Sequence, residues 1–234
     1  MIGCIGVGGV ILVPALVFVA GIAIQIAIPA AMFAYILSGL VATFVFARNK
    51  SIDWRMASSL CIGGAPAAFA GAWAVTIFDS RLLAGCLGLL TLLSGLNSLR
   101  PRIRAESDHR NLSHATLLLV GAAAGFLSSL TGTGGPLVLV PILLSMRLGV
   151  LASVGLSQIF QLPVAIAATV GNVVYGELEL PLGIILAASL SGGAWYGAKL
   201  AHAAPRATLR RIVCGALVLV GLAILAIVGW RLFV

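Results

Sequence analysis

Residues 130–141 read Leu-Thr-Gly-Thr-Gly-Gly-Pro-Leu-Val-Leu-Val-Pro, which sets three glycines and a proline inside an otherwise apolar stretch. Glycine is a poor helix former, whereas proline suits the first turn of a helix. We therefore expect one helix to end before Gly132 and a short helix to begin at Pro136, as a helical hairpin. One long kinked helix over residues 115–146 is the alternative interpretation.

The same pattern occurs near the start of the chain, where residues 6–14 read Gly-Val-Gly-Gly-Val-Ile-Leu-Val-Pro. A shift of 126 residues superposes Gly6, Gly8 and Gly9 on the three later glycines. We expect two homologous repeats, 1–99 and 113–234, joined by an Arg-rich linker over 100–112, with the first repeat shortened at its N-terminus. Broken segments at matching places in two halves are a sequence sign of a secondary transporter's binding site.

The composition predicts a membrane protein. Hydrophobic residues make up 61% and charged residues 9% of the 234 residues, whereas about a quarter of a soluble domain is charged. The apolar segments lack the alternation of barrel strands, so we expect an all-α, polytopic membrane protein. Most of the segments are long enough to span, which takes about 20 residues. The nine apolar segments, of which 136–146 is the shortest, cover residues 2–24, 27–46, 56–78, 82–99, 115–130, 136–146, 150–170, 180–201 and 212–228.

Basic residues form clusters at 48–55, 100–110 and 206–211, and the positive-inside rule assigns all three clusters to the cytoplasm. The connections around Asp79 and Glu179 are expected outside. An even number of crossings must then separate the second cluster from the third, which requires that both arms of the glycine break count as crossings. This predicts a second repeat that is inverted relative to the first.

The apolar segments contain no acidic residue, which disfavours a carboxylate site for a cation. Helix N-termini offer backbone N–H groups and about half a positive charge, and glycine lets an oxyanion approach the backbone. The sequence therefore predicts an anion site at paired half-helix N-termini near the midplane. The candidate residues are Gly8, Gly9, Tyr35, Thr131, Thr133, Gly134, Gly135, Ser157, Gln158 and Gln161.

Ser157 and Gln161 are spaced to share one helix face, and Tyr35 takes the place of Gln161 at the repeat shift. We interpret the Ser157 and Gln161 pair as pore-lining; hydrogen bonding between helices is the alternative. The small-residue runs 63–71 and 193–197 instead predict close helix packing.

Neither a metal nor a cofactor is predicted, because the histidines are scattered near loops and the four cysteines lack CxxC spacing. A membrane-embedded enzyme would need acids, histidines or cysteines clustered within the membrane. The sequence shows no such cluster, so we do not expect an enzyme. The net charge of +8 fits cytoplasmic loops beside anionic lipid headgroups and does not indicate nucleic acid. Homo-oligomerisation is left open.

Taken together, the motifs resemble the sulfite exporter TauE/SafE family of permeases, also called the 4-toluene sulfonate uptake permease family. The resemblance covers the chain and rests on the duplicated glycine element, Ile52-Asp53-Trp54, Gly155-Leu156-Ser157 and the run 193–198. It implies transport of small sulfur-containing anions such as sulfite, thiosulfate or organosulfonates across the cytoplasmic membrane. The alternative is a non-transporting membrane scaffold or assembly partner, or a truncated, degenerate permease.

Overall fold

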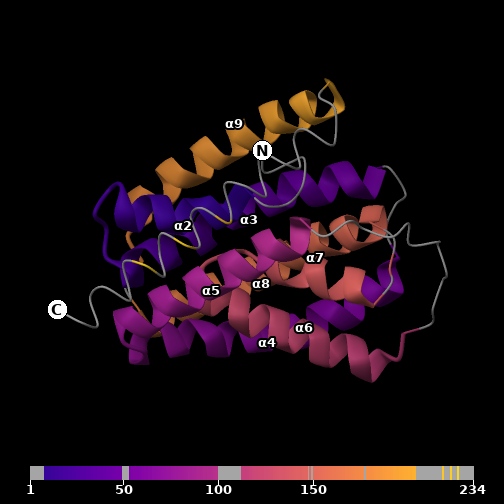
Figure 1. The fold of residues 1–234 in the computed structure, drawn as a ribbon, viewed down its shortest axis with the longest axis horizontal. Helices are drawn as coiled ribbons and strands as arrows, with labels where there is room; N and C mark the ends of the chain where they lie inside the picture. The colour runs from indigo at the N-terminus through magenta and orange to yellow at the C-terminus, as the bar shows by residue number, and fades with distance from the viewer. Residues whose placement is uncertain are drawn as a thin grey trace.

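The computed structural model describes residues 8–48, 53–99, 112–146, 148, 150–176 and 178–203, and positions 218, 222 and 226. Within these residues the chain forms helices and no strand, which confirms the all-α prediction. Figure 1 shows helices lying side by side along the longest axis. They are α2 (Gly8–Phe18), α3 (Ile24–Arg48), α4 (Trp54–Ile77), α5 (Ser80–Leu99), α6 (His114–Thr131), α7 (Pro136–Ser145), α8 (Val150–Tyr175) and α9 (Leu180–Ala203).

Two side-chain hydrogen bonds show which helix ends lie together. Gln25 Nε2, at the start of α3, donates to Ser80 Oγ, at the start of α5, over 2.6 Å. Arg55 Nε, in the first turn of α4, donates to His114 Nε2, the first residue of α6, over 3.1 Å. The starts of α3 and α5 therefore share one end of the bundle, and the starts of α4 and α6 share the other.

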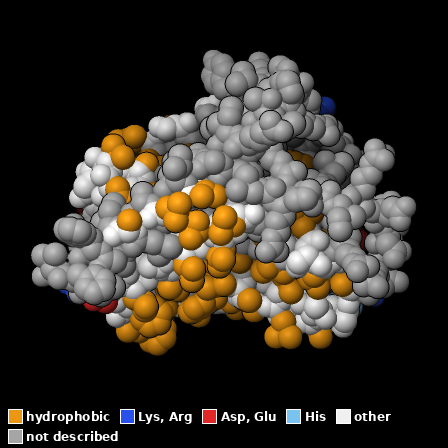
Figure 2. Space-filling view, viewed as in Figure 1, with side chains coloured by type: hydrophobic (Ala, Val, Ile, Leu, Met, Phe, Trp, Pro, Cys, Tyr) orange, Lys and Arg blue, Asp and Glu red, His pale blue; other side chains and the backbone are white. Residues whose placement is uncertain are grey.

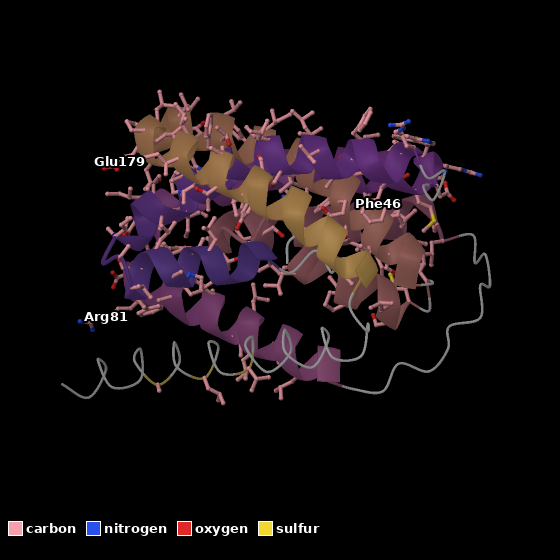
Figure 3. The ribbon with its side chains drawn as sticks, turned by 90° about the horizontal axis from the view of Figure 1, so that it is seen from above. Phe46, Arg81 and Glu179 are labelled. Atoms are coloured by element: carbon pink, nitrogen blue, oxygen red, sulfur yellow. The ribbon has the colours of Figure 1, made fainter. Side chains whose placement is uncertain are left out.

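We name these the Glu179 end and the Arg48 end. In Figure 3, Arg81 and Glu179 lie at one end of the bundle and Phe46, two residues before Arg48, lies toward the other. The two connections that the charge pattern expects outside, around Asp79 and Glu179, thus share an end. The linker 100–112 and the cluster at 206–211 lie almost wholly outside the described residues.

Glycines bring α4 and α6 into backbone contact. A Cβ atom at Gly63 would meet the Leu118 carbonyl, and one at Gly125 would meet the backbone of Gly64. Contacts continue to Gly71, where a Cβ atom would lie 2.7 Å from the Phe126 carbonyl. The close packing predicted for 63–71 is confirmed; the side chains of 193–197 lie outside the described residues.

Apolar side chains cover the outside of the bundle. Phe44, Leu119 and Ile185 are 63%, 72% and 64% exposed, and Figure 2 shows hydrophobic side chains spread over the described part of one face. Soluble proteins rarely expose apolar patches larger than a few hundred Å². By length and composition, α3, α4, α6 and residues 152–175 of α8 could each cross a membrane.

The first expected segment, 2–24, is not one continuous span. α2 ends at Phe18, and a turn through Gly21 at φ 69° leads to α3 at Ile24. Glycine tolerates this left-handed backbone, which strains other residues. The 11 described residues of α2 extend about 16 Å, roughly half of a hydrocarbon core. The sequence did not reveal the turn, because the apolar pattern continues through these residues without a polar interruption.

Candidate functional site

The glycine stretch 132–135 breaks the helix where the sequence predicts. Gly132, Gly134 and Gly135 have φ values of 66°, 77° and 105°. The Thr133 and Gly132 N–H groups donate back to the carbonyls of Ser128 and Ser129, over 3.1 and 3.4 Å. This Schellman arrangement ends α6. One continuous kinked helix over 115–146 is therefore wrong.

The break lies against the middle of α3 and of α8. A Cβ atom at Gly134 would lie 2.8 Å from the ring of Tyr35, and one at Gly135 would lie 3.1 Å from the ring of Phe160 and 3.7 Å from Gln161 Cα. Tyr35 and Gln161 each stand about halfway along a helix of 25 or 26 residues. The structure thus brings together Gly134, Gly135, Tyr35 and Gln161, which the sequence singled out separately.

Hydroxyl groups surround the same break. Thr131 Oγ1 donates to the Leu127 carbonyl over 2.7 Å and lies 3.1 Å from Thr133 Oγ1. The hydroxyls of Ser128 and Ser129 are fully buried and have no hydrogen-bond partner among the described residues. A buried polar group left unpaired costs about 1–3 kcal/mol. The two hydroxyls therefore have unused hydrogen-bonding capacity in the last turn of α6, where Ser129 Cβ faces Gly71 of α4.

Gln161 also joins two helices. Its Nε2 donates to Ser38 Oγ over 3.2 Å, and Ser38 Oγ donates to the Tyr35 carbonyl over 3.3 Å. Ser157 Oγ instead donates to the Val154 carbonyl of its own helix over 2.8 Å. The helix-to-helix hydrogen bond offered as the alternative for this pair is thus present for Gln161, and a pore-lining role stays a prediction for both residues.

The site is closed to solvent in this conformation. Thr131, Thr133, Ser157, Gln158 and Gln161 are between 0% and 4% exposed. A ligand would reach them only after the surrounding helices move.

The first turn of α7 offers few backbone donors. Pro136 has no N–H group, and the N–H groups of Val138 and Leu139 donate to the Gly135 carbonyl over 3.2 and 3.0 Å. The helix end alone is a weaker anion receptor than an ideal N-terminus. Neighbouring hydroxyl and amide groups would have to supply the remaining contacts.

Two residues of the first glycine motif, Gly8 and Gly9, lie within α2 (Gly8–Phe18). The sequence predicted instead that they precede the helix, and Gly6 lies outside the described residues. Further along α2, Val13 touches the second break, because a Cβ atom at Gly132 would lie 2.9 Å from Val13 Cγ2. The short helix of the first half and the break of the second half therefore pack together.

The described acidic residues lie away from the break. Asp53, Asp79 and Glu179 are exposed at helix ends, and Asp53 caps α4 by accepting from the N–H groups of Arg55 and Met56 over 3.0 and 3.2 Å. Glu106, Asp108 and Glu177 lie outside the described residues. Among the described residues no group of three or more His, Cys, Asp or Glu side chains could hold a metal ion.

Sequence reasoning missed three buried hydroxyl residues near the break, Ser38, Ser128 and Ser129. The serine pair directly precedes the Thr131 to Gly135 stretch, so its position was a usable signal. Ser38 follows Tyr35 by one helical turn, but only the packing of α3 on α8 brings it to Gln161.

Comparison with known proteins identifies a family whose model matches most of this chain. The family model described as "Sulfite exporter TauE/SafE" matches residues 1–224. "Probable membrane transporter protein YunE" of Bacillus subtilis is 24% identical over 85% of this chain and 81% of its own length. "Probable membrane transporter protein MJ0441" of Methanocaldococcus jannaschii is 26% identical over 82% of this chain and 78% of its own length. No solved structure matches the chain.

Proposed function

This chain belongs to the sulfite exporter TauE/SafE family of membrane transporters, and we propose that it carries small sulfur-containing anions such as sulfite, thiosulfate or organosulfonates across the cytoplasmic membrane. The observation that carries the proposal is the Gly132 to Gly135 break, which is buried among hydroxyl and amide groups between the middles of α3 and α8.

In this proposal α6 and α7 form a re-entrant hairpin. The hydrogen bond from Arg55 to His114 ties the start of α6 to the Arg48 end. α8 runs from that end to the Glu179 end, because Tyr175 packs on Phe69 of α4 at 5.5 Å between ring centroids. Few residues separate the end of α7 at Ser145 from the start of α8. Both arms would therefore enter from the Arg48 end, with the glycine tip between them deep in the bundle.

The helix positions support two inverted repeats. α3 and α8 begin at residues 24 and 150, and α4 and α9 at 54 and 180, so both differences, 150 − 24 and 180 − 54, equal the 126-residue shift of the glycine motifs. The short helices α2 and α7 lie toward opposite ends of the long axis in Figure 1. Their N-termini would then face one another near the midplane, as in transporters built from inverted repeats.

The chemistry of the site suits an anion that must also be released. Hydroxyls, amides and helix N-termini supply partial positive charges, and the described acidic side chains lie at helix ends. A permanent cation in the site would hold the anion more tightly, and transport needs binding that is weak enough for release.

The test is flux of radiolabelled sulfite into proteoliposomes that hold the purified chain, with and without an imposed proton gradient. We expect saturable uptake, and sensitivity to the gradient would identify a coupled carrier. Vesicles with Gly135→Val protein are the matched control, in which the site is disrupted. A side chain at that position would press on the Phe160 ring and would sit on a backbone with positive φ. Equal flux in empty, wild-type and variant vesicles would overturn the proposal and favour a non-transporting scaffold.

A further inference from the structure

A second feature, a cavity with a few polar side chains in its wall, lies at the Glu179 end, away from the glycine break. It has a volume of about 270 Å³, lies between α3, α4 and α8, and is lined among others by Gln25, Pro29, Thr76, Asn172, Tyr175 and Gly176. A water molecule occupies roughly 30 Å³ in the liquid, so the cavity has room for a small oxyanion.

Asn172 is the group in this cavity whose hydrogen-bonding capacity is unused. Its side chain is 1% exposed, and neither Nδ2 nor Oδ1 has a partner among the described residues. By contrast, Gln25 Nε2 donates to Ser80 Oγ over 2.6 Å and Thr76 Oγ1 donates to the Trp73 carbonyl over 2.7 Å. Buried amides in folded proteins are almost always paired. Asn172 is among the residues that line the cavity, and its unpaired amide, which is covered in this conformation, therefore indicates a polar ligand.

A polar stripe on α8 connects this cavity to the glycine break. Gln158, Gln161, Thr169 and Asn172 fall within about 80° of one another around the helix at 100° per residue. All four are buried, and Thr169 Oγ1 is also unpaired among the described residues. Only the small residue Ala165 separates the two polar pairs along the stripe. Gln161 and Asn172, 11 residues apart, are separated by about 16 Å along the helix axis.

We propose that this cavity is the mouth of the anion path at the Glu179 end, where Asn172 Nδ2 donates to the oxyanion before the anion moves along α8 to Gln161. The inference rests on the proposed function, because it takes the transported ion to be an anion. A neutral amide offers two N–H donors without a formal charge, so it would help to remove water from the oxyanion and still release it.

The test is chemical labelling of Asn172→Cys in a chain whose four cysteines, at 4, 61, 86 and 214, are replaced by alanine. A charged, membrane-impermeant maleimide is applied to proteoliposomes, with toluenesulfonate as the competing anion because sulfite would consume the reagent. The matched control is Val173→Cys, at the adjacent residue, which is 61% exposed on the apolar outer surface. We expect Asn172→Cys to react at least tenfold faster than the control, and toluenesulfonate to slow it several-fold.

Reaction of Asn172→Cys as slow as that of Val173→Cys would overturn the inference, and so would labelling that the anion does not slow. A second measurement tests the inference even if the Asn172→Cys protein misfolds. Asn172→Asp adds a negative charge at the mouth and is expected to raise the KM for sulfite about tenfold, against a few-fold for Asn172→Ala; equal KM values would count against the path. Flux by the unmodified chain in the same vesicles reports separately on the proposed function.

Discussion

Gln161 Nε2 donates a hydrogen bond to Ser38 Oγ over 3.2 Å, which joins two residues 123 positions apart in the sequence. The bond links the middle of α8 to the middle of α3, at the level where the glycine break contacts both helices. Any helix movement that opens the break to an anion would strain or release this bond. Gln161 is therefore placed to hold the closed state, and the proposed site adds contact with the anion as a second role.

A double-mutant cycle with Gln161→Ala and Ser38→Ala separates these two roles. Hydrogen bonds between membrane helices contribute only about 0.6 kcal/mol on average, so we expect small and non-additive changes in thermal stability. If Gln161 also contacts the anion, Gln161→Ala raises the KM for sulfite about tenfold whereas Ser38→Ala changes it by less than about threefold, since a tenfold change corresponds to about 1.4 kcal/mol. Equal effects of the two variants on KM would assign Gln161 a structural role alone.

Any side chain at Gly134 or Gly135 of the glycine break should abolish transport without removing the protein from the membrane. Gly134→Ala and Gly135→Val each force a Cβ atom into a left-handed backbone and toward an aromatic ring, and the backbone term alone costs about 1–2 kcal/mol. Gly9→Val tests the equivalent position of the first repeat. Flux and size-exclusion profile are measured together.

Gly85→Ala is the control for these variants, because a Cβ atom there would meet nothing within 4 Å. We expect it to keep wild-type flux. Wild-type flux in Gly135→Val as well would contradict the candidate site.

Ser128→Ala and Ser129→Ala remove hydroxyls that have no partner among the described residues. Because no hydrogen bond is lost, we expect thermal stability to stay the same or to rise slightly. If the hydroxyls bind the anion, the KM for sulfite rises several-fold. Ser189→Ala is the matched control, since Ser189 lies exposed on α9 and donates to the Ile185 carbonyl over 2.8 Å. A drop in stability without any change in KM would point to packing instead.

A cytoplasm-restricted thiol reagent tests the orientation of the repeats. With native cysteines removed, it is expected to label Arg48→Cys and Arg210→Cys and to leave Arg81→Cys unmodified, because Arg81 lies at the opposite end of the bundle from the Arg48 end (Figure 3). Lack of labelling at Arg210→Cys would contradict the inverted second repeat. Labelling of Arg48→Cys and Arg81→Cys from the same side would contradict the membrane crossing itself.

Gly125→Leu should unfold the protein rather than alter its affinity for the anion. A Cβ atom at Gly125 would meet the backbone of Gly64, which leaves no room for the larger side chain to turn away. We expect a loss of monodisperse protein in detergent and a large fall in melting temperature, in line with the several-kcal/mol cost of the most disruptive core substitutions. Gly192→Ala, where a Cβ atom would meet nothing within 4 Å, is expected to behave like the unmodified chain.

The sequence by itself determined the membrane class, the helical fold and the place of the second break. Continuous apolar composition needs only hydropathy to be recognised, and Gly132, Gly134 and Gly135 stop a helix through their own backbone freedom. The turn at Gly21 escaped recognition because its apolar neighbours give no local signal. Local chemistry thus accounts for what could be predicted.

Only the tertiary structure decided which polar groups meet. Tyr35 and Ser38 reach the break because α3 packs against α8, and the Ser38 to Gln161 bond spans 123 residues. Asn172 was not singled out from the sequence, and only the packing of α3 and α4 against α8 places it at a cavity. Burial and pairing depend on neighbours distant in the chain, and helical periodicity reports only the face of a helix, not the partner that covers it.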